Sequence, residues 1–470
     1  MKLHNTLTGR LEEFVPLVPG KAGMYVCGVT VYDRSHIGHA RALVTFDVLF
    51  RYLRFIGYDV TFVRNFTDVD DKIIRRAQEA GIPAIELAEA NIRSFGEDVQ
   101  VLGCLPPTIE PRATEHIGEM IALIEELIRN GLAYAAEGDV YFAVDKFPGY
   151  GKLAKRKLDD MIAGARVEVD ERKRHPMDFA LWKGSKPGEP WWDSPWGKGR
   201  PGWHIECSVM STKYLGQPFD IHGGGTDLIF PHHENEIAQS EGAKGCAFAR
   251  YWVHNGMVTI DQEKMSKSLG NFMTVQEAAG RVGGEAVRLF VIGTHYRSPL
   301  DFSPERLDES ARALARLYET LARADATLGD AARTAAPDAA VIDEFRGAMD
   351  DDLNTARAVG VVFETVRTIN RLLDEQQRAA AAPLRRAVAT IADVLGVGAG
   401  EPRAVLEHAK REHLADAAID AGEIERCIAA RNAARTARDF KQADAIRAEL
   451  KTKGIVLEDT AAGTVWKVER

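Results

Sequence analysis

This sequence of 470 residues has few cysteines, no long apolar stretch and no excess of positive charge. Its five cysteines are scattered and odd in number, which argues against a disulfide framework and indicates a reducing, cytoplasmic setting. No apolar run reaches the ~18–20 residues of a membrane span, and the first residues, MKLHNTLTGRLEEF, lack the apolar core of a signal peptide. A formal net charge of −9 excludes a protein that coats nucleic acid over its whole surface, so a nucleic-acid site must be a local basic patch.

A strand, a helix and a second strand follow one another near the N-terminus. Residues 24–29 are a short apolar run, residues 43–53 repeat apolar side chains every three or four positions, and residues 60–63 are again strand-like. This order predicts a doubly wound α/β fold, which binds ligands at the carboxyl ends of its strands.

The remaining sequence suggests several further regions. Five of the seven tryptophans lie between Trp182 and Trp203, in a stretch rich in Gly and Pro that indicates an insertion into the α/β sheet. Ser303 and Pro304 predict a helix start, and helical patterns continue from there. We expect a catalytic domain in two halves (1–103 and 203–254), an inserted connective domain (104–202), a region with a lysine-rich loop (255–302), an all-α helical bundle (303–400) and a small C-terminal α+β module (401–470).

Two motifs suit a nucleotide. The sequence HIGH, residues 36–39, opens the first helix, where backbone N–H groups attract phosphate and two imidazoles face one side of a turn. The sequence KMSKS, residues 264–268, places two lysines among small hydroxyl residues, which suits a loop that clamps a polyphosphate. Each motif alone is equally compatible with an ordinary helix start or a solvated basic loop.

A third set has the residue types of a zinc site. Cys27 closes the first strand, Cys207 lies in WHIECS, and His232 and Glu236 lie four residues apart at an expected helix start with Pro231 near its first position. Because these residues are far apart in sequence, buried cysteines and a surface His/Glu pair are the better explanation when the residues are taken alone.

Taken together, HIGH and KMSKS resemble the class I aminoacyl-tRNA synthetases. The stretches MYVCGVTVYDRSHIGHAR, WHIECS, FDIHGGGTDLIFPHHENEIAQS and EKMSKSLGNF closely resemble the cysteinyl-tRNA synthetase family, from about Met24 to the C-terminus. The resemblance implies a Rossmann-type class I catalytic domain split by an insertion. It also implies the substrates ATP, L-cysteine and tRNA(Cys), a monomer, and no membrane partner.

The resemblance assigns roles to individual residues. One zinc ion per chain is expected on Cys27, Cys207, His232 and Glu236, because zinc binds thiolate and so separates cysteine from serine. Mg²⁺ is expected with ATP. The catalytic residues would be His36, His39, Lys264 and Lys267; the ATP contacts Gly28, Gly38, Asp227, Lys267 and Ser268; and the cysteine contacts Thr67 and Trp203.

The C-terminal tail is locally basic, with eight basic and three acidic residues between positions 426 and 453. Arg431, Arg435 and Arg438 fall on one predicted helical face, and apolar packing behind that face is expected from Phe440, Ala443, Ile446 and Leu450. With Trp466, the pattern suits RNA backbone contact and base stacking, although a solvated basic face explains it equally well. The resemblance favours an anticodon-binding module.

Three alternative functions share part of this pattern. A cysteine ligase of mycothiol synthesis, which acts on an amino sugar, has no need of a basic tail with Trp466. A non-catalytic RNA-binding paralogue has no need of intact HIGH and KMSKS sequences. A simple nucleotidyltransferase needs neither the zinc residues nor the tail. A cysteine–tRNA ligase activity is therefore the expectation.

Overall fold

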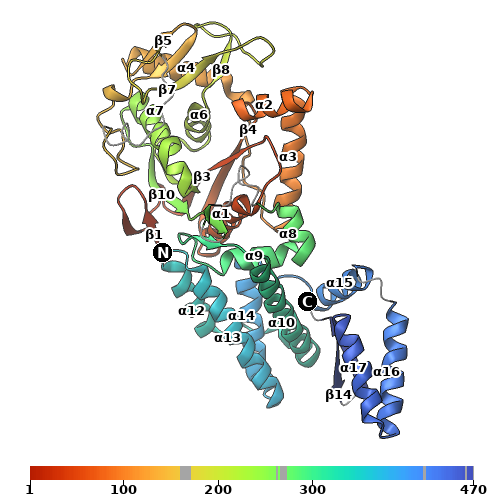
Figure 1. Ribbon diagram of the computed structural model, residues 1–470. Helices are drawn as coiled ribbons and strands as arrows, with labels where there is room; N and C mark the ends of the chain where they lie inside the picture. Colours follow the sequence, from red (N-terminus) through yellow and green to blue (C-terminus); the bar gives the residue numbers. More distant parts are fainter. Residues whose placement is uncertain (159–170, 261–262, 265–271, 417–419, 461–462, 469–470) are drawn as a thin grey trace. The chain divides into compact units, whose positions relative to one another are not determined.

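The computed structural model describes the 470 residues apart from 159–170, 261–262, 265–271, 417–419, 461–462 and 469–470. The chain divides into two compact units, residues 1–302 with 344–359 and residues 303–343 with 360–470 (Figure 1). No helix among the described residues is long and apolar enough to cross a membrane.

The first unit is built around a four-stranded parallel sheet in the order β10-β9-β3-β4 (Figure 1). Its strands are β3 (Lys21–Thr30), β4 (Asp59–Thr67), β9 (Phe219–Gly225) and β10 (Ala249–Asn255). Helix α1 (Ile37–Phe55) crosses from β3 to β4 and buries one side chain row that includes Leu43, Phe46, Leu49 and Leu53. The predicted strand–helix–strand unit is confirmed. The chain places β4 on one side of β3 and the later strand β9 on its other side. Such a switch point opens a crevice at the carboxyl ends of the strands.

An antiparallel sheet is inserted in the chain between β4 and β9, as expected of a split catalytic fold. It has the order β5-β6-β7-β8, with strands β5 (Ala133–Ala136), β6 (Asp139–Phe142), β7 (Phe179–Gly184) and β8 (Gly199–Pro201). Helices α2 (Asp71–Ala80), α3 (Ala84–Val101) and α4 (Ile117–Arg129) precede it, and α6 (Trp203–Leu215) follows. Trp182 of β7 is fully buried in a core that also contains Tyr25 of β3 and Trp252 of β10. The inserted and parallel sheets therefore share one apolar core.

The remaining elements of the first unit surround the parallel sheet. The hairpin β1 (Lys2–Asn5) and β2 (Arg10–Glu13) lies at the N-terminus, and α7 (Glu234–Lys244) precedes β10. A small sheet β12-β11-β13 then contains β11 (Val258–Ile260), β12 (Glu263–Lys264) and β13 (Leu300–Asp301), with α8 (Val275–Val282) and α9 (Gly284–Ile292) between its last two strands.

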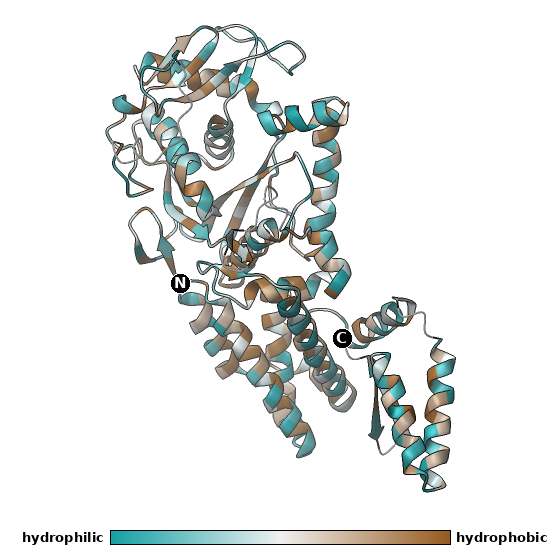
Figure 2. Cartoon of the chain, viewed as in Figure 1, coloured by the Kyte–Doolittle hydropathy of each residue, from teal (hydrophilic) through white to brown (hydrophobic). Residues whose placement is uncertain are grey.

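The chain beyond Phe302 forms a series of helices followed by a short hairpin, as predicted for a helical bundle and an α+β module. Ser303 accepts a hydrogen bond from the Arg306 N–H at 3.4 Å and caps the helix that begins at Pro304. The helices are α10 (Pro304–Leu328), α11 (Ala331–Thr334), α12 (Ala339–Asp350), α13 (Thr355–Asp374), α14 (Arg378–Leu395), α15 (Pro402–Asp416), α16 (Ala421–Thr436) and α17 (Phe440–Thr452), and a hairpin of β14 (Ile455–Thr460) and β15 (Gly463–Val468) closes the α+β module. Hydrophobic and hydrophilic segments alternate along these helices, as in amphipathic helices (Figure 2).

Two details of the C-terminal module differ from the sequence-based expectation. Helix α16 ends at Thr436, so Arg438 lies in the following turn with a φ of 60°, not on the helical face of Arg431. Phe440 was expected to pack inward, yet 62% of it is exposed. It is the first residue of α17, at a point where α16 has already ended, whereas Ala443 and Leu450 further along α17 are buried.

Candidate active site

A break in the β3–β4 pairing presents Cys27. The register of the two strands shifts between Val26 and Val29, and such a bulge re-aims the side chains within it. A Cβ atom on Gly28 would lie 1.6 Å from the Asn65 carbonyl oxygen, so only glycine allows this close approach. The Gly28 N–H donates to Asn65 Oδ1 at 2.9 Å, which fixes the bulge at the end of the sheet.

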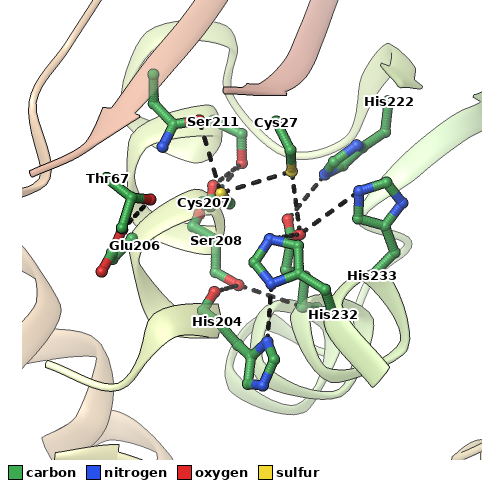
Figure 3. Close-up of polar contacts among 12 residues, drawn as sticks. Cys27, Thr67, His204, Glu206, Cys207, Ser208, Ser211, His222, His232 and His233 are labelled. Atoms are coloured by element: carbon green, nitrogen blue, oxygen red, sulfur yellow. Dashed lines mark hydrogen bonds and ion pairs between the residues drawn. The ribbon is translucent and has the colours of Figure 1, made fainter. Parts of the chain in front are cut away.

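Four side chains from separate parts of the sequence meet beside this bulge (Figure 3). Cys27 Sγ lies 3.5 Å from Cys207 Sγ and 3.4 Å from Glu236 Oε1. His232 Nε2 lies 3.0 Å from the same Glu236 oxygen. One ligand atom from each residue lies within 4.8 Å of the others, so the predicted set is brought together as a candidate metal site. His232 comes from the turn Ile229–His233 that precedes α7, rather than from the first turn of that helix.

The electrostatics of this cluster favour a bound cation. Cys207, His232 and Glu236 are each at most 2% exposed. Burial raises the pKa of the Cys27 and Cys207 thiols and lowers the pKa of His232. A buried carboxylate beside two thiols is unfavourable without a compensating charge, and a divalent ion supplies that charge while it favours the thiolate forms. The donor chemistry therefore fits a metal.

Further histidines surround the ligand set, and sequence reasoning missed them. His222 Nε2 lies 2.8 Å from Glu236 Oε2, and His233 Nδ1 lies 2.8 Å from His254 Nε2. Cys27, His222, His233 and Glu236 form a second group whose ligand atoms also lie within 4.8 Å. The first group has two sulfur donors and the second has one, so zinc's preference for thiolate favours the first. The adjacent pair His232-His233 was visible in the sequence and signals one of these extra imidazoles.

The HIGH residues form the cap of α1. The Gly38 N–H donates to His36 Nδ1 at 3.0 Å, and the His36 N–H donates to His39 Nδ1 at 3.1 Å. A nitrogen that accepts a backbone N–H carries no proton, so each neutral ring carries its proton on Nε2. The two rings lie 4.0 Å apart between centroids. The motif therefore orients two Nε2–H donors, which suit phosphoryl oxygens.

One cavity of about 860 Å³ is lined both by this motif and by Cys27 of the metal cluster. Its walls include Cys27, Trp203 and Asp227 as well as the glycines and histidines predicted to meet ATP, namely Gly28, His36, Gly38 and His39. The Trp203 ring stacks on His232 at 4.2 Å between centroids. The nucleotide motif, Cys27 of the metal cluster and the predicted cysteine contact Trp203 thus line the same space.

Thr67 has a different environment. It is 2% exposed and does not line the cavity, and its hydroxyl donates to Glu206 Oε2 at 2.7 Å (Figure 3). Glu206 is fully buried, and burial raises its pKa well above the ordinary value. Sequence reasoning gave Glu206 no role. Of the KMSKS residues, Lys264 belongs to β12, and Lys267 and Ser268 lie outside the described residues.

The predicted RNA contacts in the C-terminal module are partly engaged within the protein. Arg431 is buried and donates from both terminal nitrogens to Asp459, at 2.9 and 3.0 Å. Arg435 also donates to Asp459, at 2.7 Å. The Trp466 indole N–H donates to Glu425 Oε1 at 3.0 Å, and the Lys410 ammonium lies 5.0 Å from the Trp466 ring centroid. Arg431 therefore stabilises the module itself.

Comparison with protein families matches three consecutive parts of the chain. Residues 13–312 match the tRNA synthetases class I (C) catalytic domain, residues 344–399 match the DALR domain, and residues 421–466 match the cysteinyl-tRNA ligase anticodon binding domain. The first match alone covers more than half of the chain.

Relatives and solved structures agree with these matches. The chain is 58% identical over 483 residues to the cysteine–tRNA ligase of Geobacter metallireducens and 57% identical over 479 residues to that of Geobacter sulfurreducens, with 100% of each chain covered. Among solved structures it resembles Mycobacterium tuberculosis methionyl-tRNA synthetase bound to methionyl-adenylate, with a TM-score of 0.57 and 18% identity over 81% of this chain and 90% of that one. It also resembles the LeuRS of Agrobacterium radiobacter K84, with a TM-score of 0.63 and 12% identity over 83% of this chain and 86% of that one. At these identities the structures show the shared fold.

Proposed function

The chain belongs to the cysteinyl-tRNA synthetase family, and from this premise we propose how its residues divide the work of a cysteine–tRNA ligase. In the first step the carboxylate of cysteine attacks the α-phosphorus of ATP, which gives cysteinyl-adenylate and releases pyrophosphate. In the second step a terminal ribose hydroxyl of tRNA(Cys) attacks the adenylate carbonyl, and AMP leaves. The first step needs an amino-acid pocket next to a triphosphate site, which the shared cavity supports.

We assign the amino-acid pocket to the metal cluster. Cys27, Cys207, His232 and Glu236 would hold one zinc ion, which when bound supplies affinity for the thiolate of cysteine over the hydroxyl of serine. Trp203, which stacks on His232, would cover the adjacent substrate carbon atoms and exclude water. Thr67 would act indirectly, through its hydrogen bond to Glu206 on the helix that carries Cys207.

The triphosphate site is assigned to the start of α1. The Nε2–H groups of His36 and His39 would donate to phosphoryl oxygens as negative charge develops on them in the transition state. Asp227 would accept from ribose hydroxyls, and Gly28 and Gly38 would leave space for the nucleotide. From KMSKS, Lys264 and Lys267 would neutralise the charge of the leaving pyrophosphate and Ser268 would donate a hydrogen bond to it, with Mg²⁺ carried in by ATP.

For the RNA partner we propose a contact that differs from the arginine face expected from sequence. Phe440 is exposed at the start of α17, with exposed Arg438 two residues before it and exposed Lys441 directly after it in the chain. An exposed aromatic ring between cations suits stacking of an unpaired base with contacts to its phosphates. Arg435 would add charge nearby, and Trp466, which is held by Glu425, would support the module.

One cavity is lined by the HIGH motif and by Cys27, which belongs to the metal cluster, and this observation carries the proposal. The test is ATP–pyrophosphate exchange with cysteine or serine, followed by product analysis with tRNA or an amino sugar as acceptor. We expect exchange with cysteine alone and transfer to tRNA alone. Exchange with serine would contradict the metal pocket, and transfer to the amino sugar would support the alternative ligase.

A further inference from the structure

Four basic residues that line the cavity are not used by the assignments above, namely Arg64, Lys72, Arg75 and Arg76, and Lys72 is the one that lies against Trp203. Lys72 lies in the first turn of α2 and lines the same cavity as Cys27 and His36. Its ammonium lies 5.9 Å from the ring centroid of Trp203 and 5.6 Å from that of Tyr32. It therefore contacts one aromatic ring beside the metal cluster and another that precedes the HIGH motif.

The acidic neighbours of Lys72 are occupied by other groups. The Asp70 side chain accepts from the Lys72 backbone N–H at 2.8 Å and caps α2. Asp71 accepts from Lys183 at 2.6 Å and also pairs with Arg200. Within the described part of the chain, no carboxylate lies within 4.0 Å of the Lys72 ammonium and no hydrogen-bond acceptor meets it. The side chain is exposed to the cavity and held only by aromatic faces.

The position of this ammonium relative to the two half-sites suggests its ligand. Trp203 stacks on His232, so the Trp203 side of Lys72 is adjacent to the pocket that would hold the substrate sulfur. Cysteine is a short molecule, and its carboxylate must leave that pocket in the direction of the HIGH motif to reach ATP. The Lys72 ammonium lies near one ring from each of those two regions. A cation there can bind a carboxylate that lies between the thiol pocket and the HIGH motif.

We propose that Lys72 binds the α-carboxylate of the substrate cysteine and orients it toward the α-phosphorus of ATP. The tyrosine and tryptophan faces hold the ammonium in place by cation–π attraction without neutralising it, so its charge stays available to the substrate. This proposal rests on the proposed thiol pocket, and it adds a second recognition point at the opposite end of the amino acid.

The experiment compares two thiols in the full-length enzyme. The KM for cysteine and the inhibition constant of cysteamine, which has the thiol and the amine but no carboxylate, are measured by ATP–pyrophosphate exchange for the wild type and for Lys72→Met. We expect the KM for cysteine to rise about ten- to hundredfold, the range of one charge-assisted hydrogen bond, and the inhibition constant of cysteamine to change less than about twofold. Lys72→Arg should recover part of the loss. The control is Lys213→Met on α6, an exposed lysine paired with Glu119 that does not line the cavity.

Three results would overturn the assignment. If Lys72→Met weakened the binding of cysteine and of cysteamine by the same factor, Lys72 would only support Trp203. A rise in the KM for ATP alone would assign its charge to the nucleotide. Unchanged exchange with reduced tRNA charging would assign it to the RNA 3′ end. Failure of cysteamine to compete with cysteine in the wild type would instead contradict the proposed thiol pocket, which separates the two proposals.

Discussion

His204 Nδ1 lies 2.8 Å from His232 Nδ1, on the side of the His232 ring opposite to the candidate metal ligand atom Nε2. When Nε2 binds a metal, Nδ1 carries the ring proton and donates it to an acceptor, so His204 would set the tautomer and the orientation of His232. The His204 pKa is lowered to about 3 by burial, which keeps this ring neutral and able to accept near neutral pH.

Removing that acceptor should weaken metal binding without unfolding the protein. We expect His204→Phe to lower zinc affinity about 10–100-fold, the usual effect of losing a hydrogen bond to a metal-bound imidazole. Competition with a chromogenic chelator measures the change. His408→Asn, at an exposed position in the second unit, is the control. Equal zinc affinity in His204→Phe and the control would reduce His204 to a packing role.

Metal uptake should release protons. Burial raises the pKa of both Cys27 and Cys207 above that of an ordinary thiol, so the metal-free protein holds both sulfurs protonated at neutral pH. A metal binds thiolates, so binding must expel these protons, and the logarithm of zinc affinity should rise with pH by about two per unit. Zinc titration in weakly buffered solution, with the released acid back-titrated, measures this number. Cys207→Ser should release one proton fewer, whereas release of none would contradict two thiolate ligands.

A substitution should separate the roles of the two His39 nitrogens, since Nδ1 caps α1 and Nε2 is proposed to donate to phosphate. In His39→Asn the side-chain oxygen can still accept from the His36 N–H, which preserves the cap of α1, but the donor at the Nε2 position is lost. We expect kcat for adenylation to fall about 10²–10³-fold with little change in the melting temperature. Pre-steady-state pyrophosphate release and thermal unfolding test the two halves of this statement. A large loss of stability with unchanged chemistry would assign the motif to folding alone.

Local patterns predicted this molecule well where one element or one motif decides the outcome. The apolar spacing of α1, the Ser303 cap and the residue types of Cys27, Cys207, His232 and Glu236 were all visible in the sequence. The partners of these groups were not, because contacts such as Thr67 with Glu206 or His204 with His232 depend on how distant segments pack.

For the C-terminal arginines, the sequence predicted exposed side chains, and it did not show that distant residues pair with two of them. Helical spacing placed Arg431, Arg435 and Arg438 on one face, but it could not show that the hairpin after α17 brings Asp459 against two of them. Nor could it show that α16 ends before Arg438. A basic pattern predicts a charged face, while the acids that neutralise it come from elsewhere in the chain.

Asp459 should make the stability of the C-terminal module sensitive to acid. The hydrogen bond from Arg431 lowers the Asp459 pKa below the ordinary aspartate value. A group whose folded pKa is lowered stabilises the fold above its unfolded pKa, about 4, and the contribution is lost as pH falls below that value through the folded pKa. Asp459→Asn should therefore destabilise the module at pH 7, with the difference from wild type narrowing toward pH 3. Hydrogen exchange over residues 421–468 follows this, with the exposed Asp444→Asn as control. A difference that does not vary with pH would contradict the linkage.

Substitutions of Phe440 and Arg431 should have separate effects, the first on RNA recognition and the second on the stability of the module. Phe440 is exposed and packs on little, so Phe440→Ala should leave cysteine-dependent pyrophosphate exchange and the melting temperature nearly unchanged. Loss of one stacked base should lower kcat/KM for tRNA charging about 5–100-fold.

Arg431→Met should instead affect stability, because it removes the buried partner of Asp459. Hydrogen exchange in the module should rise, and charging should fall only as far as the module unfolds. Val465→Ala, another exposed apolar side chain of the same module, is the matched control for Phe440→Ala. Unchanged charging by Phe440→Ala would remove this ring from RNA recognition, and a loss confined to Arg431→Met with normal hydrogen exchange would restore the arginine to a direct phosphate contact.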